Sequence, residues 1–137
     1  MIVNISECVD LMVVDAEEET YRPLLQALVA AGLNYQQAYD GHQALQIAAG
    51  SSARLWITNL HLPDMSGIEL LQIVKATRPR TLFYLVSDQY SAQDEILARS
   101  TGAAGYLSKP ANRNWLELCQ TTLSRSSVRA GPSHAPS

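Results

Sequence analysis

The chain has 137 residues, a net charge of −3 and 47% hydrophobic residues, a length and composition that suit one domain with an ordinary core. Only 17% of the residues are charged and no basic run is present, so we expect no nucleic-acid binding by this segment. The sequence contains neither a membrane-spanning apolar stretch nor a leader peptide, which predicts a soluble cytoplasmic protein without a membrane partner.

Short apolar runs alternate with segments of helical periodicity along the chain. The apolar runs predict strands at 9–14, 34–39, 55–58, 81–86 and 106–107. Apolar residues at helical spacing predict helices after these strands, at 21–32, 44–50, 66–77, 91–100 and 112–124. Ser66 with Glu69 and Ser91 with Asp94 form N-terminal caps, and residues 51–54 are predicted as a loop.

The C-terminal part of the chain combines the last helix with a polar tail. Asn112 or Asn114 can cap this helix, and Cys119 lies beside Trp115 on its apolar face, so we expect the thiol in the core. Cys8 and Cys119 match no metal or redox spacing. Beyond about residue 125 the composition is dominated by small polar residues and proline. We therefore predict a domain at 1–124 and a flexible tail or the start of a linker at 125–137.

Strand–helix alternation at this spacing predicts an α/β fold: a five-stranded parallel sheet, doubly wound, with right-handed crossovers and helices on both faces. In such a sheet the residues that follow each strand meet at one edge, where ligands bind. The residues placed there are 15–17, 59–61, 87–88 and 108–109. The topology therefore brings together a carboxylate, an amide, a hydroxyl and an ammonium group.

Several motifs around these positions resemble the response-regulator receiver (CheY-like) family, over roughly residues 9–124. The most specific are Leu-Pro-Asp-Met-Ser-Gly at 62–67 and Gly-Ala-Ala-Gly-Tyr-Leu-Ser-Lys-Pro at 102–110. Val-Val-Asp at 13–15 and Asp-Gly-His-Gln-Ala-Leu at 40–45 add support. The resemblance implies a flavodoxin-like receiver fold and a role in two-component (phosphorelay) signal transduction.

Receivers of this family accept a phosphoryl group from a histidine kinase on an aspartate at the end of the third strand. Two acidic residues after the first strand hold a magnesium ion beside it, while a hydroxyl after the fourth strand and a lysine after the fifth contact the phosphoryl oxygens. The resemblance assigns the last two roles to Ser87 and Lys109, and the aromatic switch position of the fifth strand to Tyr106. It also implies a cis peptide bond between Lys109 and Pro110.

Two positions depart from the family pattern: Asn59 stands at the acceptor position, and Ala16 replaces the second acidic ligand. A neutral amide is a very poor nucleophile, so phosphotransfer to Asn59 is not expected. Magnesium prefers carboxylate oxygens. Only Asp15 remains of the acidic set, with Glu17 as a substitute carboxylate and the backbone carbonyl of His61 as the further ligand that the resemblance implies. We therefore predict a degenerate member of the family with no catalytic residue, no cofactor and, at most, weak magnesium binding.

Each retained residue also has a plain structural explanation. Lys109 can pair with Asp15, because an unpaired ammonium at a partly buried edge is costly. Ser87 can cap the following turn, and Tyr106 can be a static core residue. Residues 17–19 can serve the helix dipole in the first turn of their helix. From the sequence, both sets of roles remain open.

The leading hypothesis is a receiver-like domain, not an enzyme, that acts through protein–protein contacts without phosphorylation. Its partner would be an output domain, a histidine kinase or another regulator, and family analogy places the contact or dimer surface on the fourth helix, fifth strand and fifth helix, around 91–100 and 106–119. A second hypothesis is a working phosphoacceptor that uses Asp64 or His61, or in which Asn59 replaces a natural aspartate. A third is a receiver that senses a small anion beside Lys109.

Overall fold

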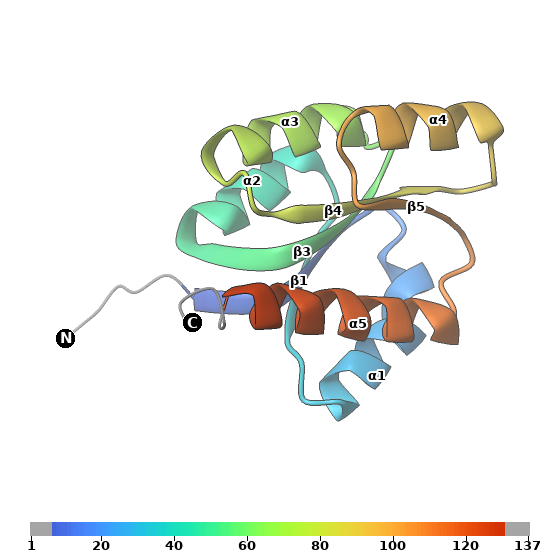
Figure 1. The fold of residues 1–137 in the computed structure, drawn as a ribbon. Helices are drawn as coiled ribbons and strands as arrows, with labels where there is room; N and C mark the ends of the chain where they lie inside the picture. The colour runs from blue at the N-terminus through green and yellow to red at the C-terminus, as the bar shows by residue number, and fades with distance from the viewer. Residues whose placement is uncertain (1–6, 131–137) are drawn as a thin grey trace.

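Five parallel strands form one sheet in the order β2-β1-β3-β4-β5 (Figure 1). The computed structural model describes residues 7–130. The strands are β1 (Glu7–Val14), β2 (Tyr35–Ala38), β3 (Ser51–Asn59), β4 (Leu82–Ser87) and β5 (Gly105–Ser108). The helices are the 3₁₀ helix η1 (Glu18–Tyr21) and the α-helices α1 (Arg22–Ala30), α2 (Gly41–Gly50), α3 (Gly67–Thr77), α4 (Ala92–Ser100) and α5 (Arg113–Ala130).

Helices cover both faces of the sheet. Figure 1 shows α2, α3 and α4 on one side and α1 and α5 on the other. The inner strands of a parallel sheet covered in this way are buried on both sides, which explains the apolar runs of β1, β3 and β4 in the sequence. The strand order and parallel pairing confirm the predicted doubly wound α/β fold. Across residues 7–130, no helix has the length and apolar character needed to cross a membrane.

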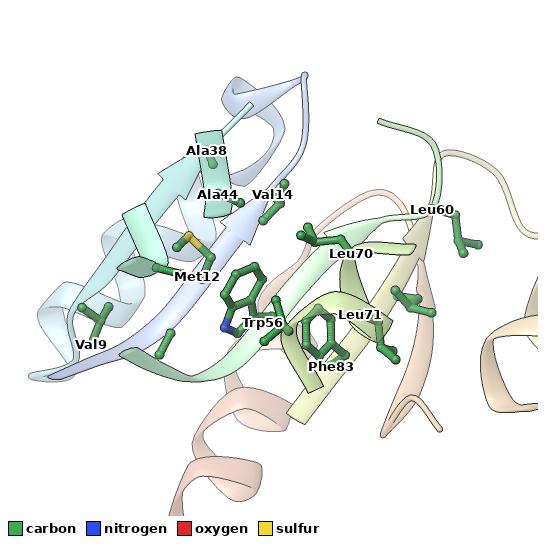
Figure 2. Packing of buried hydrophobic residues seen from close by; sticks show 14 of the residues in the cluster. Val9, Met12, Val14, Ala38, Ala44, Trp56, Leu60, Leu70, Leu71 and Phe83 are labelled. Atoms are coloured by element: carbon green, nitrogen blue, oxygen red, sulfur yellow. The ribbon is translucent and has the colours of Figure 1, made fainter. Parts of the chain in front are cut away.

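The sheet divides the hydrophobic core into two clusters. In the cluster of Figure 2, Trp56 stacks on Phe83 with ring centroids 5.2 Å apart. On the opposite face, Leu55 and Ile57 pack with residues of α1 and α5. Neighbouring side chains of a strand point to opposite faces, so β3 contributes to both clusters, and each fully buried large side chain stabilises the fold by about 1.5–3 kcal/mol. The central strand that ends at Asn59 is therefore firmly anchored.

The start of β3 differs from the sequence prediction. Residues 51–54 were expected in a loop, but β3 begins at Ser51, so that prediction is wrong. Pairing with β1 along its whole length holds these polar residues in the sheet. Arg54 adds an ion pair with Asp10 at 2.7 Å. Register with a neighbouring strand has outweighed the local polar composition, as is common for strands.

The last helix is longer than expected. α5 continues to Ala130, whereas the sequence analysis ended the domain at residue 124. Residues 125–130 contain neither glycine nor proline, so nothing in them interrupts the backbone hydrogen bonds of a helix. The rest of the predicted tail, 131–137, lies outside the described residues. Cys119 is 1% exposed, which confirms its predicted place in the core.

Local signals at helix ends and turns were read correctly. Ser66 and Glu69 form a reciprocal capping box at the start of α3, and Ser91 caps α4. The side chain of Asn112 accepts a hydrogen bond from the backbone N–H of residue 114 at 2.9 Å, which caps α5. The peptide bond that precedes Pro110 is cis, as the family resemblance implied.

Candidate functional site

Polar side chains from four strand ends meet at one edge of the sheet. Asp15 follows β1, Asn59 ends β3, Ser87 ends β4 and Lys109 follows β5. Backbone hydrogen bonds continue the sheet past these positions. The N–H of Lys109 donates to the carbonyl of Ser87 at 3.1 Å, and the N–H of Asp15 donates to the carbonyl of the last residue of β2 at 3.0 Å. Asp15, Asn59 and Ser87 are buried. The structure thus brings these residues together as the topology predicted.

The loop after β3 folds back and starts α3 directly against the strand end. The N–H of Gly67 donates to the carbonyl of Leu60 at 2.9 Å, and the N–H of Leu62 donates to the carbonyl of Met65 at 3.1 Å. A Cβ atom on Gly67 would lie 2.3 Å from the carbonyl oxygen of Asn59. The close backbone approach therefore requires glycine here, and it fixes the position of the Asn59 backbone.

Lys109 lies at the centre of three carboxylates. Its Nζ is 3.0 Å from Asp15 Oδ2, 2.8 Å from Glu17 Oε1 and 2.9 Å from Asp88 Oδ1. The Lys109 side chain is only 9% exposed. An ammonium group has three N–H donors, and each of them has a carboxylate partner. The predicted pairing of Lys109 with Asp15 is confirmed, and two further carboxylates join it.

The amide of Asn59 points its nitrogen at two of the same carboxylates. Nδ2 donates to Asp15 Oδ2 and to Asp88 Oδ1, at 3.0 Å each. Oδ1 accepts from the backbone N–H of His61 at 2.8 Å. This orientation of the amide follows from its partners, since the nitrogen faces acceptors and the oxygen faces a donor.

Asn59 and Lys109 therefore bridge the same two carboxylates, and the four side chains form a closed ring. Donors and acceptors alternate around it: the Asn59 amide, Asp15, the Lys109 ammonium and Asp88. Both N–H groups of the amide and all three of the ammonium have an acceptor. The polar atoms at this edge of the sheet are thus satisfied by one another.

The charges of the ring reinforce each other. Burial lowers the pKa of the Lys109 ammonium, but the hydrogen bonds to Glu17, Asp88 and Asp15 outweigh it and hold that pKa above its usual range. The hydrogen bond from Lys109 lowers the pKa of the Asp88 carboxyl; burial opposes this effect, and the hydrogen bond from Asn59 adds to it. Lys109 and Asp88 are therefore both charged at neutral pH, which keeps their pairing intact.

Tyr21 supports the ring from the buried side. Its hydroxyl donates to Asp15 Oδ2 at 2.8 Å, and its ring centroid lies 5.9 Å from Lys109 Nζ. Burial, with the charge of Asp15 next in importance, raises the pKa of the Tyr21 hydroxyl above its usual range. No site role for Tyr21 was predicted from the sequence. The sequence offers one indication of this role: Tyr21 carries a hydroxyl at an otherwise apolar position of the predicted helix 21–32, six residues after Asp15.

The Ser87 hydroxyl turns away from the ring. It donates to the carbonyl of Gln89 at 2.7 Å, which is the predicted turn-capping role. It also contacts the hydroxyl of Tyr106, and because its own proton goes to Gln89, Tyr106 is the donor. The Tyr106 hydroxyl in turn accepts from the backbone N–H of Ser91 at 3.0 Å. Tyr106 thus ties β5 to the start of α4.

The remaining predicted site residues take other positions. Ala16 is exposed and offers no metal ligand. Glu17 pairs with Lys109, a contact that the sequence analysis did not predict, while Glu18 and Glu19 lie in the first turn of η1 as expected. His61 is exposed and contributes its backbone N–H to Asn59.

Asp64 is engaged at the start of α2, outside the ring. Its carboxylate accepts from the backbone N–H of Gly41 at 2.9 Å and of His42 at 2.8 Å, and it also contacts the His42 imidazole. Burial raises the pKa of the Asp64 carboxyl, but these N–H donors outweigh it and hold that pKa at about 2. The carboxylate acts as a tertiary cap of α2, which leaves it badly placed for a second role as a phosphoacceptor.

The donor set of the ring does not fit a magnesium ion. Magnesium needs oxygen ligands with free lone pairs in near-octahedral geometry, and here N–H donors of Asn59 and Lys109 already contact Asp15 Oδ2 and Asp88 Oδ1. A divalent ion would also meet the Lys109 ammonium. Within residues 7–130, no group of three or more His, Cys, Asp or Glu side chains is arranged to hold a metal.

The strand order 2-1-3-4-5 is that of the flavodoxin-like sheet, in which ligands bind at the carboxyl ends of the strands. The response regulator receiver domain family matches residues 11–119. The chain belongs to this family. It is similar to the transcriptional regulatory protein ZraR of Salmonella typhimurium, with 30% identity over 110 residues that cover 80% of this chain and 25% of that protein.

Solved structures agree with the fold. A CheY-like receiver domain from Methanospirillum hungatei has a TM-score of 0.78 at 24% identity, covering 91% of this chain and 99% of that one. A response regulator from Burkholderia pseudomallei, solved with a phosphorylated aspartic acid, calcium ion and citrate, has a TM-score of 0.72 at 26% identity, covering 93% and 75%. The chain spans from 25% to 44% of the length of the first curated relatives that it matches.

Proposed function

We propose that this receiver domain has lost its phosphoacceptor and acts in two-component signalling through protein contacts, without phosphorylation. The observation that carries the proposal is the amide of Asn59, whose nitrogen donates to Asp15 and Asp88. A phosphoacceptor must present an anionic oxygen with a free lone pair. The amide is neutral, its nitrogen lone pair is delocalised into the carbonyl, and its N–H groups face the carboxylates.

The engagement of Lys109 supports the same proposal. Its three N–H donors are already used by carboxylates, so none remains for the oxygens of an incoming phosphoryl group. The two carboxylates of the ring outnumber its single ammonium, and Glu17 adds a third carboxylate beside it, so the site has a net negative charge. Such a field repels an anionic phosphoryl donor, and it argues equally against a site for a small anion.

The exposed apolar residues of α4 and the loop before it fit a protein partner. Tyr90, Ile96 and Leu97 are 62%, 70% and 47% exposed. These are three of the six exposed large apolar residues in the described part of the chain; the other three, Val29, Tyr39 and Ile73, are spread over other segments. We place the partner surface on α4, β5 and α5, for an output domain, a histidine kinase or another regulator, and for any dimer. Curated relatives longer than this chain are consistent with an attached output domain.

The test is phosphoryl uptake by the purified chain. Incubation with radiolabelled acetyl phosphate and magnesium, and separately with a histidine kinase, is expected to give no stable label. A stable label on the wild-type chain would sink the proposal. The positive control is the double variant Asn59→Asp with Ala16→Asp, which restores both missing carboxylates. Label on that variant alone shows that the fold is competent and that the two positions account for the loss.

A further inference from the structure

Asp88 belongs to the loop between β4 and α4, yet its carboxylate reaches the centre of the ring. Its side chain is 64% exposed, so it approaches from the solvent side. Oδ1 lies 3.0 Å from Asn59 Nδ2 and 2.9 Å from Lys109 Nζ. Asp15, by contrast, is 3% exposed and forms the buried side of the ring. The two carboxylates therefore come to the same donors from opposite directions, one fixed in the core and one carried by a loop.

Asn59 and Lys109 together form an anion-binding pair. An ammonium and an amide N–H converge on a single oxygen atom, and charge-assisted hydrogen bonds of this kind are how proteins bind carboxylate and phosphate oxygens. The oxygen that they hold belongs to the chain itself. An external oxyanion that sought these donors would have to displace Asp88 first.

The same loop has a second attachment on its other side. The Ser87 hydroxyl donates to the carbonyl of Gln89 at 2.7 Å and contacts the Tyr106 hydroxyl. That hydroxyl accepts from the backbone N–H of Ser91 at 3.0 Å. The Tyr106 ring packs edge-on against the Tyr90 ring, with the ring centroids 5.9 Å apart. Because Ser91 caps α4, the loop and the first turn of α4 are held from both ends.

We propose that Asp88 is a built-in anionic ligand of the Asn59–Lys109 pair, and that it holds the β4–α4 loop and the start of α4 in one arrangement. The inference rests on the proposed function, because a receiver that is not phosphorylated needs another way to set this loop. The carboxylate supplies permanently the anion that a transferred group would supply only for a time. The α4 surface is then presented to its partner without a chemical signal.

Amide hydrogen exchange of the full chain tests this inference. In Asp88→Ala the two contacts to Asn59 and Lys109 are lost. We expect the hydrogen-bonded amides of Ser91, Asp94 and Glu95 to exchange about tenfold faster, which corresponds to 1.4 kcal/mol of opening free energy. Asp88→Asn keeps an oxygen acceptor without the charge, so exchange is expected to be intermediate. Gln89→Ala is the matched control: no hydrogen bond of the Gln89 side chain occurs among the described residues, and exchange should match wild type.

Unchanged exchange of the amides of Ser91, Asp94 and Glu95 in Asp88→Ala would overturn the inference. If Asp88→Ala does not fold, the exchange rates of Asp88→Asn provide the test. Wild-type exchange rates in Asp88→Asn would then overturn the inference. Phosphoryl uptake separates this inference from the proposed function. A labelled wild-type chain with a loosened loop in Asp88→Ala refutes only the proposed function, whereas an unlabelled chain with an unchanged loop refutes only the role of Asp88.

Discussion

Replacement of Asn59 by aspartate tests the ring most severely, because it exchanges two donors for an anion among carboxylates. Asn59→Asp removes the two N–H groups that contact Asp15 and Asp88 at 3.0 Å. It places a carboxylate oxygen at that distance from each of them. We therefore expect the variant to be less stable than wild type in metal-free buffer at pH 7.

The folded variant can either tolerate the charge repulsion or keep one carboxyl protonated, and the response that costs less free energy sets the loss of stability. The introduced carboxylate oxygen would lie 3.0 Å from an oxygen of Asp15 and from one of Asp88, and each pair repels by about 5.5 kcal/mol at an effective dielectric constant of about 20. The folded chain can avoid this repulsion by keeping one carboxyl protonated. From an ordinary aspartate pKa, protonation costs about 4 kcal/mol at pH 7 and about 1.5 kcal/mol at pH 5. We expect the free energy of unfolding to fall by about these amounts at the two pH values.

The sign of the pH dependence is part of the prediction. The introduced carboxyl has a folded-state pKa above its unfolded value, so its folded state binds the extra proton. The destabilisation is therefore absent below the unfolded pKa and grows as the pH rises. Magnesium should counteract it, because a free metal concentration of about 100 times Kd returns about 2.7 kcal/mol.

Urea unfolding in EDTA and in magnesium, at both pH values, measures these quantities. Asn114→Asp is the matched control, since it makes the same chemical change at an exposed position, where we expect a small effect and no response to magnesium. The reasoning is refuted if Asn59→Asp is as stable as wild type in EDTA at pH 7. It is equally refuted if the difference from wild type does not shrink at pH 5.

Three further substitutions probe the surroundings of the ring. Tyr21→Phe removes the hydroxyl that donates to the buried Asp15 at 2.8 Å, and should lower the free energy of unfolding by about 1.5–3 kcal/mol in urea titrations. Gly67→Ala should cost about 3 kcal/mol or more, seen as a lower Tm, because the new Cβ would lie 2.3 Å from a carbonyl oxygen of β3. Asp64→Ala removes the tertiary cap of α2 and should cost about 1 kcal/mol at pH 7. The folded pKa of Asp64 is held at about 2, below its unfolded value. The difference in stability between wild type and Asp64→Ala should therefore be constant above about pH 4 and vanish as the pH falls through the folded pKa. Thermal melts across this range measure the difference, and a difference that persisted in acid would contradict the capping role of Asp64.

The convergence of Asp15, Asn59 and Lys109 was predictable because carboxyl ends of parallel strands meet at one edge, whatever the loops do. The role of Asp88 in the ring was not predictable, even though its position at that edge was predicted. Its carboxylate reaches the ring only through the conformation of an exposed loop, which leaves no periodic signal in the sequence. Tyr21 was missed for a related reason: its spacing is that of a core residue, and only the fold shows where its hydroxyl points.

Strand boundaries show the same division between local and tertiary information. The apolar residues 55–58 identified β3 from the sequence, but its first residues are polar and are held by pairing with β1. The helix caps at Ser66 and Ser91, by contrast, depend on residues three positions apart and were read correctly. Contacts within one turn of chain and the meeting of strand ends at one edge were therefore predictable. Contacts that depend on the conformation of a loop, or on which polar residues extend a strand, were not.

The central claim is that the donors and acceptors of the ring are already used by one another. The most direct measurement is a magnesium titration of the wild-type chain followed by NMR at the side-chain amide of Asn59. We predict that the Asn59 amide protons exchange slowly, as hydrogen-bonded donors do, and that they show no saturable shift up to about tens of millimolar magnesium. A saturable shift of the Asn59 amide together with Asp15 and Asp88 would contradict it, because it would show that the carboxylates can leave their donors for a metal ion.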